Sequence, residues 1–584
     1  MTQIRTHEAL KTDGLLTLFQ EDKGKAVFVS HQWVSETHPD PEFKQFRILQ
    51  NALRNVVSGL IHVDLDIATE LMFGDSRYLD LGAEARTQLL SIWYDYFSCP
   101  QLQIVQQGGA GGDLDKAIDS IPAYVAKCSF FCVLCPIIES PDKSRVFSPC
   151  TWAQRGWCRI ERMVHESAGH GPFVVIRSAK NLQLVATSFF ASYGSSPGLG
   201  DFSVEQDRLK TALVLKQVLS RSMRQSLRKG DFANYRVVLN AQVALFKGLP
   251  VEPIRGLVLD TDGPDGFGPN VRSRTVAEFL HQNCFRHPLE YDSAGWSPLC
   301  YACMNGDLQV IQGLLELSAN PNDQTRKAQP ILALFAANTV LGLCALFHNN
   351  DAMKLLISAK AKVNARKGTF PPVLGAIFSN NVEAIRILRQ HGASANVAAP
   401  TGISAVQQAC TTGSLEVLQV LLFETESKLP LTQALHYASI FQDSSAKIIR
   451  MLVSARADIN EQYTGSFRTV LGLVLRMRGI QYKLGGKATK SRFLGYHHRG
   501  ATPLMMAIMA GQFECAAALA VAGARLDLQN ARRKKAEDLA KQLDVPEFLM
   551  EALHGRLDRC AAVVSLATSQ DKCSDTLEED YFEV

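Results

Sequence analysis

The second half of the chain repeats one segment about every 33 residues. Related segments begin near Pro298, Val340, Pro372, Ser404, Ala434, Val470 and Pro503. The steps between these starts are 42, 32, 32, 30, 36 and 33 residues. Each unit has the pattern of two antiparallel helices, whose apolar faces cannot be buried by one unit alone. The units must therefore stack, and the sequence predicts an all-α solenoid with one elongated core.

Most units open on a pattern like T-P-L-H-x-A, continue as G-x-x-x-x-x-x-x-L-L and end on an acid or amide. That last position is held by Asn322, Asn364, Asn396, Asn460 and Asp527. This pattern resembles ankyrin repeats. The resemblance covers residues 286–555, called the repeat array below, in about seven units with a degenerate sixth. It implies that the concave face and the loops of the array bind protein partners.

The sixth unit replaces its second helix with the sequence YKLGGKATKSRFLGYHHRG. Gly485 and Gly486 would each weaken a helix by about 1 kcal/mol. Residues 476–499 contain seven Lys or Arg and no acid. Such a run could contact an acidic partner, nucleic acid or anionic lipid. Because no nucleic-acid motif accompanies it, the sequence favours a solvated loop.

Length and composition indicate several domains in a reducing compartment. A chain of 584 residues is too long for one core, and a net charge of +4 gives no strong field and no clear sign of nucleic-acid binding. The 14 cysteines are scattered through apolar segments such as CSFFCVLC, which favours free thiols and a cytoplasmic location. No signal-like amino terminus and no run of about 18 apolar residues occurs, so neither secretion nor a transmembrane segment is expected.

Residues 1–180 alternate strand and helix patterns. The expected strands are 25–30, 91–95, 130–136 and 172–177, and the expected helices are 44–57, 113–127 and 152–166. This alternation predicts an α/β domain with a mostly parallel, doubly wound sheet, in which ligands bind at the carboxyl ends of the strands. Ser30 and His31 should share that rim with residues 95–97. The insert at residues 58–90 has no assigned place, and the loop GGAGG at 108–112 is expected to be flexible.

One helix of this domain carries a carboxylate beside its apolar stripe. At about 100° per residue, Trp157 and Ile160 fall in that stripe, and Glu161 lies about 40° from Trp157. A carboxylate half-turned toward a core finds a partner, faces a cleft, or costs several kcal/mol in desolvation. Glu161 is therefore a candidate site residue. The alternatives are that it pairs with an arginine or a sheet-end amide, and that Trp157 is a core residue only.

Four motifs in order, AVFVSHQW, WYDYF, FFCVLCP and RGWCRIE, resemble those of Toll/interleukin-1 receptor (TIR) domains. The resemblance implies a flavodoxin-like sheet and self-association into a homo-oligomer. In the enzymatic branch of that family it also implies cleavage of NAD at the nicotinamide–ribose bond by Glu161, with Trp157 supporting. NAD would then be a substrate, and neither a cofactor nor a metal is required. By the same analogy Ser30, His31, Trp33 and Tyr96 would contact the nucleotide.

The chemistry suits these residue types. Breaking an N-glycosidic bond generates oxocarbenium character on the ribose, which a nearby carboxylate stabilises. An aromatic ring four residues earlier lies on the same helix face and could wall the pocket. The form WYDYFSCPQ also resembles heterokaryon-incompatibility domains, although Cys99 falls one position late for that pattern. That alternative predicts no carboxylate-lined pocket.

The remaining segments carry no visible chemistry. Residues 181–285 have the periodicity of two or three helices followed by a linker at 260–270 rich in Gly, Pro and Asp. Residues 556–584 become polar and acidic and are expected to form a disordered tail, whose final Phe-Glu-Val could enter a groove that captures carboxyl termini.

Two hypotheses follow from the sequence. In the first, the chain is an intracellular interaction and signalling protein, in which the repeat array selects a protein partner and the TIR-like domain self-associates. In the second, the same array regulates or targets an NAD glycohydrolase. An open cleft at Glu161 shared with Ser30 and Tyr96 would favour the enzyme, and a carboxylate sealed by an arginine would favour the scaffold.

Overall fold

A computed structural model describes most of the chain. The described residues are 3–20, 24–35, 37–73, 89–100, 119–168, 171–186, 196–258, 271–329, 334–364, 368–425, 428–441, 445–465, 469–485 and 489–569, with the single positions 22, 86, 116, 117 and 332. Within them no helix combines the length and apolar content that crossing a membrane requires. The expected GGAGG loop and the linker at 260–270 lie outside the described residues.

The amino-terminal domain is a mixed α/β domain built on a six-stranded sheet. Its strands run in the order β2 (Asp64–Leu65), β8 (Asn181–Val185), β7 (Phe173–Ser178), β4 (Phe130–Leu134), β1 (Gly24–His31) and β3 (Leu89–Trp93). β1 is parallel to β3 and β4, and β4 is parallel to β7. A second, two-stranded sheet pairs β5 (Ile138–Glu139) with β6 (Val146–Phe147).

The sheet departs from the expected one at β8, which lies next to the edge strand β2. β8 is antiparallel to β7, with Ser178 paired with Asn181. The connection is a two-residue turn, which can join only antiparallel neighbours because a parallel crossover needs a dozen or more residues. The domain therefore continues to residue 185 instead of ending at 180, and the sheet is mixed. The insert at 58–90 supplies β2, parallel to β8, and α3 (Ile67–Phe73).

Alternate residues of β1 are buried in two different cores. Val27 and Val29 belong to the core that contains Leu49 of α2 (Lys44–Val57). Phe28 belongs to the core that contains Ile160 of α9 (Gly156–Ser167). This period of two is the alternation of a strand covered on both faces. α7 (Ile121–Lys127) packs beside α9, and α1 (His7–Thr12) packs on α5 (Asp95–Ser98).

The helix expected over residues 152–166 is broken. It divides into α8 (Pro149–Gln154) and α9, because Arg155 has extended backbone with φ −72° and ψ 128°. The amide of Gly156 bonds to the carbonyl of Asp201. A Cβ atom on Gly156 would lie 2.1 Å from the Phe202 ring, so the break is fixed by close packing against the segment that follows η3 (Pro197–Leu199).

In the described part of the expected connector there are three α-helices: α10 (Asp207–Arg228), α11 (Phe232–Leu245) and α12 (Val271–Gln282). α10 packs on α9 of the α/β domain and on α11. α11 and α12 in turn pack on the first helix pair of the repeat array. The connector therefore continues the stack of the array and joins it to the α/β domain.

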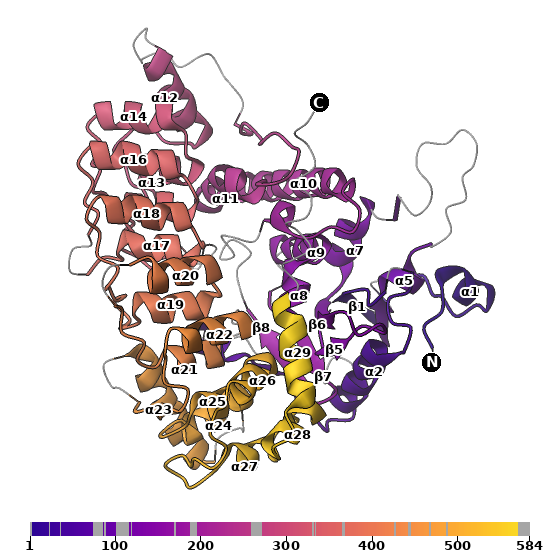
Figure 1. Cartoon of the computed structure of the whole chain (residues 1–584). Coiled ribbons are helices and arrows are strands. Elements are labelled where there is room, and N and C mark those ends of the chain that lie inside the picture. Colours follow the sequence, from indigo (N-terminus) through magenta and orange to yellow (C-terminus); the bar gives the residue numbers. More distant parts are fainter. Residues whose placement is uncertain are drawn as a thin grey trace, which may run out of the picture.

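The repeat array contains eight helix pairs, followed by one further helix, in the described residues. The pairs are α13 (Pro298–Asn305) and α14 (Leu308–Glu316), α15 (Val340–Leu346) and α16 (Asn350–Ser358), α17 (Pro372–Phe378) and α18 (Val382–Gln390), α19 (Ala405–Thr412) and α20 (Leu415–Phe423), α21 (Ala434–Ile440) and α22 (Ala446–Ser454), α23 (Val470–Lys483) and α24 (Lys490–His497), α25 (Pro503–Ala510) and α26 (Phe513–Val521), and α27 (Ala536–Ala540) and α28 (Glu547–Leu553). Figure 1 shows the array curving from α14 to α28 around the α/β domain.

Two segments expected to lack structure are helical. α24 occupies the basic segment of the sixth unit, and it packs closely on α23 because both helices offer glycine at the crossing. A Cβ atom on Gly479 would lie 2.4 Å from the carbonyl oxygen of Gly495. α29 (Asp558–Ser569) occupies the start of the expected tail and packs on α26 and α22, with Cys560 buried. The segment after residue 569, which includes Phe-Glu-Val, lies outside the described residues.

Candidate functional site

The carboxyl ends of β1 and β3 bring several of the expected site residues together. Ser30 and His31 are the last two residues of β1 and are buried. Asp95 follows β3 at the first position of α5. Since β1 and β3 are parallel neighbours, their ends lie at the same rim of the sheet. We call this part, at β1 and β3, the open half of the rim.

Glu161 reaches this rim from α9. The Ser30 hydroxyl donates to Oε2 of Glu161 at 2.6 Å and accepts from the indole N–H of Trp152 at 3.0 Å. Burial raises the pKa of Glu161 to about 8, and the hydrogen bond from Ser30 offsets only part of this effect. The carboxyl therefore holds a proton at neutral pH. No ion pair engages Glu161 among the described residues. The alternative that an arginine pairs with Glu161 is therefore not observed.

Beside it, the buried His31 pairs with Asp95, whose side chain is partly exposed. Nε2 of His31 lies 2.8 Å from Oδ1 of Asp95, and the indole N–H of Trp33 donates to Oδ2 at 2.7 Å. Tyr94 stacks on His31 with ring centroids 4.0 Å apart. Burial lowers the pKa of His31, but Asp95 outweighs it, so the pKa of His31 is raised. Burial likewise raises the pKa of Asp95, and His31 more than reverses it.

The other two expected residues lie differently. Tyr96 is half-buried; its amide donates to Asp95 at 2.6 Å, and its ring meets Trp33 edge-on at 5.7 Å. Trp157 instead donates its indole N–H to Asp207 of α10 at 2.9 Å. Trp157 therefore packs toward the connector, whereas Ser30, His31 and Glu161 meet at the rim.

Two further residues organise this half of the rim: sequence reasoning placed Asp95 at the rim without giving it a role, and it missed Trp152. Asp95 joins His31, Trp33 and the Tyr96 amide, and Trp152 holds Ser30 from α8. The only signal for Asp95 was its place directly after an apolar strand. Trp152 had none, because its contact with Ser30 spans 122 residues of sequence.

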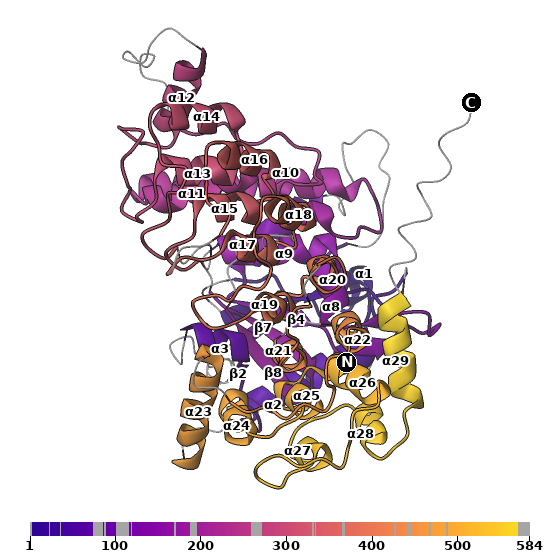
Figure 2. The same ribbon diagram turned by 60° about the vertical axis from the view of Figure 1, so that its left-hand side comes forward.

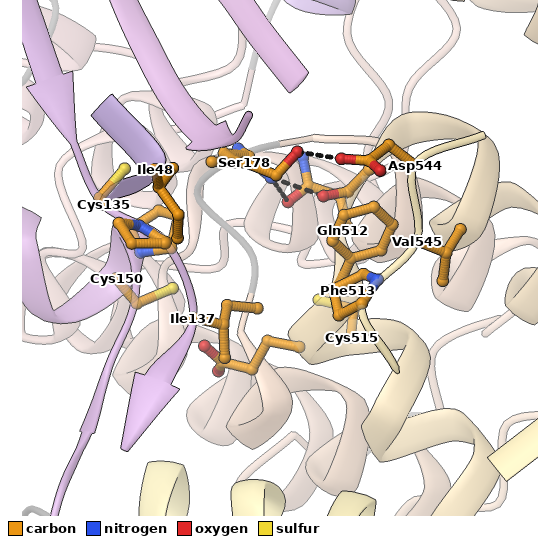
Figure 3. Close-up of a pocket in the computed structure, with 16 residues that line it drawn as sticks. Ile48, Cys135, Ile137, Cys150, Ser178, Gln512, Phe513, Cys515, Asp544 and Val545 are labelled. Atoms are coloured by element: carbon orange, nitrogen blue, oxygen red, sulfur yellow. Dashed lines mark hydrogen bonds between the residues drawn. The ribbon is translucent and has the colours of Figure 1, made fainter. Parts of the chain in front are cut away.

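The other half of the rim, at the ends of β4 and β7, is covered by the repeat array. We call it the covered half. Arg177 of β7 donates from Nη1 to the carbonyl of Gly511 at 2.7 Å and to Oε1 of Gln512 at 3.2 Å. Ser178 bonds to Asp544, in the loop between α27 and α28. A cavity of about 220 Å³ lies between the two units, as Figure 3 shows.

Basic residues of the sixth unit also bind the α/β domain. Arg478 of α23 pairs with Glu70 of α3 at 3.1 Å, with both side chains largely buried. Lys490 of α24 bonds to Asn181 of β8. Burial lowers the pKa of Lys490 to about 8, although nearby acids such as Asp64 oppose it. The basic run is thus partly an interface within the chain, which corrects the expectation of a solvated loop.

The opposite face of α23 is apolar and exposed. Its residues follow one another at steps of three and four positions, and their exposed fractions range from 48% to 80%: Val470, Leu473, Met477, Ile480 and Leu484. Figure 2 shows α23 at the edge of the molecule. We call these five residues the α23 stripe. Its spacing is that of a helix seam that packs against another helix.

Comparison with known proteins identifies the repeats. Residues 373–463 match the family described as ankyrin repeats (3 copies), and residues 294–326 and 499–531 each match an ankyrin repeat. These segments are ankyrin repeats, which confirms the prediction from their period. The chain is similar to ankyrin repeat and SAM domain-containing protein 6 of Danio rerio, with 29% identity over 136 residues. That match spans 23% of this chain but only 17% of the relative.

A solved structure is also similar to this chain. The human ASB11 ankyrin repeat domain shares 21% identity and a TM-score of 0.30. The match covers 45% of this chain and 98% of that domain.

Proposed function

We propose that this ankyrin-repeat protein is an interaction and signalling protein whose array binds an amphipathic helix of a partner through the α23 stripe. Ankyrin repeats suggest binding to proteins, and the stripe is the observation that carries the proposal. Large exposed apolar patches on soluble proteins mark interaction sites. Five side chains, four about half exposed and Leu484 80% exposed, would together contribute roughly 5 kcal/mol when covered, which is the scale of a reversible complex.

Charge specifies the kind of partner. Arg476 and Lys483 are the charged residues of α23 besides Arg478, which already pairs with Glu70, and no acid occurs between Glu461 and Glu514. A second copy of α23 would bring like charges together, which opposes pairing. A helix with leucines at the same spacing and glutamates beside them would complement both the apolar seam and the charge.

A synthetic helix tests this proposal. We expect a peptide with leucine at steps of three and four and flanking glutamates to bind the full chain, measured by fluorescence anisotropy. The double variant Leu473→Ser, Ile480→Ser should weaken binding at least tenfold. The matched control Leu209→Ser, Leu213→Ser, on the exposed face of α10, should not. Equal binding of a lysine-flanked peptide, or a dimer in sedimentation that the α23 variant abolishes, would contradict the proposal.

The second candidate function is cleavage of NAD by a TIR-like α/β domain. What supports it is the contact of Glu161 with Ser30 beside His31, at the strand ends where ligands of such sheets bind. In this proposal Glu161 acts on the ribose, Ser30, His31, Trp33 and Tyr96 line the nucleotide site, and self-association completes it. Trp157 would position α9 through Asp207 and would not touch the sugar.

Nicotinamide release by the full chain tests this second candidate. Glu161→Gln should abolish release, whereas Asp207→Asn, which keeps an acceptor for Trp157, should retain most of it. No release by the unaltered protein, at concentrations that permit self-association, would leave the α/β domain as an assembly module. A cytoplasmic location suits both candidates, since the 13 described cysteines are all free thiols.

A further inference from the structure

Four basic side chains gather at two neighbouring turns of the repeat array. They come from the turn before α25 and the turn before α27: Arg499, Arg532, Arg533 and Lys534. The amide of Ala531 donates to the carbonyl of Arg499 at 2.9 Å. A Cβ atom on Gly500 would lie 3.0 Å from that amide nitrogen, so the missing side chain lets the two turns approach closely. We call the four cations the basic patch.

The turn before α27 is held by Asn530, which is buried. Its Oδ1 accepts from the amides of Arg532 and Lys534 at 2.9 Å and 3.1 Å, and its Nδ2 donates to the carbonyl of His497 at 3.1 Å. The amide of Arg533 donates to the carbonyl of Asn530 at 2.9 Å. Because these bonds fix the backbone, a ligand of the basic patch need not order it, which lowers the cost of binding.

The cations of the basic patch are not balanced by acids. Three of them are exposed and Arg532 is half-buried. Basic residues on either side in the sequence are paired, Arg525 with Asp527 at 2.6 Å and Lys541 with Glu537 at 2.6 Å. No ion pair engages a member of the basic patch in the part of the chain that the structure describes.

The positive charges of the basic patch affect two histidines beside it. The pKa of His497 is lowered to about 4, by burial first and by the charges of Arg532 and Lys534 second. Burial also lowers the pKa of His498, and the charges of Arg499 and Arg532 add to this effect. Both turns therefore direct their charge at the same small region, and one short anionic segment can neutralise both.

α24 separates the basic patch from α23. The guanidinium carbon of Arg532 lies 3.3 Å from the centroid of the Tyr496 ring of α24, and that ring lies 4.7 Å from the ring of Tyr482, at the carboxyl end of α23. Figure 2 shows α24 between α23 and α27, the helix that follows the patch. Packed helices are about 8–10 Å apart, so roughly 20 Å separates a helix bound on the α23 stripe from the patch, and about six extended residues span that distance.

We propose that the basic patch binds an acidic segment of the partner whose helix covers the α23 stripe, with a short linker between the two; this inference rests on the proposed function. The patch lies on turns of ankyrin repeats, and the loops of repeat arrays often form the binding face. Four cations on two turns fit a short run of carboxylates, whereas nucleic-acid-binding proteins typically contact about 6–10 phosphates. Tethering by the helix raises the local concentration of the acidic segment, so even a weak contact adds to affinity.

Three labelled peptides test this inference by fluorescence anisotropy with the full chain. The first is the leucine helix flanked by glutamates, the second adds a Gly-Ser linker of about six residues and about six glutamates, and the third carries glutamines in their place. Extensions are made at either end, because the helix can lie in either direction. We expect the glutamate extension at one end to tighten binding at least tenfold over the glutamine extension. That gain should shrink as NaCl rises from about 0.05 M to about 0.5 M.

Variants locate the gain on the surface. The patch variant replaces three exposed cations whose side chains make no hydrogen bond within the described residues: Arg499→Gln, Arg533→Gln and Lys534→Gln. It should remove most of the gain and bind the unextended helix as before. The matched control removes the same charge from the exposed face of α10 and should keep the gain: Arg221→Gln, Arg224→Gln and Arg228→Gln.

The outcomes separate this inference from the proposed function. If the unextended helix does not bind, both are overturned. If that helix binds but the glutamates add nothing, or if the α10 control loses the gain as fully as the patch variant, this inference alone is overturned. Binding of phosphatidylserine vesicles that the patch variant abolishes, with no gain from the glutamates, would assign the patch to anionic lipid and would also overturn it.

Discussion

The two halves of the sheet's rim differ in how their polar side chains are paired. On the open half, Ser30 bonds to Glu161, and His31 pairs with Asp95 within the α/β domain. On the covered half, Arg177 spends one nitrogen on the array and leaves two without partners. Leaving a buried donor unpaired costs about 1–3 kcal/mol. The comparison shows that the polar groups of the open half pair within the α/β domain, whereas Arg177 on the covered half depends on the repeat array for the contacts it makes.

The largest effect is expected at the contact between α23 of the array and α3 of the α/β domain. Arg478→Met leaves Glu70 buried without its cation, and we expect a loss of about 3–5 kcal/mol in the free energy of unfolding, measured in urea. The double variant Glu70→Leu, Arg478→Met should recover most of it. If the single variant costs less than about 1 kcal/mol, this pair does not hold the two units together.

On the open half, Glu161→Gln should remove a pH dependence. The folded protein holds the proton of Glu161 up to a pKa of about 8, whereas the unfolded chain releases it near 4.5. The stabilisation is therefore full below the lower value and is lost as pH rises through the upper one. We expect the variant to match the unaltered protein near pH 4 and to exceed it in stability by about 2–4 kcal/mol near pH 9. The same difference in stability between the variant and the unaltered protein at both pH values, measured by thermal melting, would contradict this prediction.

Asp95→Asn should weaken the open half by a smaller amount. We expect a loss of about 1–3 kcal/mol, because His31 and Trp33 keep only a neutral partner. The pKa of His31 is raised by Asp95, so the loss should be greatest at low pH and shrink as pH rises through that pKa. Titration of the His31 ring by NMR checks the sign: its pKa should fall in the variant.

The smallest effect is expected at the turn that meets Arg177. Gly511 has φ +76°, and a Cβ atom there would lie 3.2 Å from Nδ2 of Asn181. We expect Gly511→Ala to cost about 1–2 kcal/mol. Gly523→Ala also lies at positive φ but has nothing within 4 Å of an added Cβ, so it separates backbone strain from contact with β8. If both variants lose the same free energy of unfolding, the contact with Asn181 makes no contribution.

Local patterns predicted the array well. Pro298, Val340, Pro372, Ala434, Val470 and Pro503 are each the first residue of a helix. Threonine or serine before the helix and proline at its first position are signals that one short segment contains in full. The helix over residues 44–57 followed from the same kind of periodicity, and α2 has these bounds.

Features made by distant residues were not predictable. Gly485 and Gly486 suggested a loop, yet the segment forms α24, in which Gly495 permits close approach to Gly479 of α23. Arg177 and Gln512 meet across 335 residues of sequence, so neither half of the chain contains a signal for the covered rim. Within the candidate site, strand ends predicted that Ser30 and His31 share the rim with Asp95, whereas the contact of Ser30 with Trp152 of α8 had no signal in the sequence.

The array is joined to the α/β domain at both of its ends, through α10 and α11 at one and through α24, α25 and the Asp544 loop at the other. A solenoid sums a small rotation at each repeat into its curvature. Because both ends of the array are held by the α/β domain and the connector, its total curvature is fixed. A partner that straightens one repeat therefore changes the curvature of the neighbouring repeats or strains the contacts of Arg177 with the array. Binding along the array is in this way coupled to the covered half of the rim.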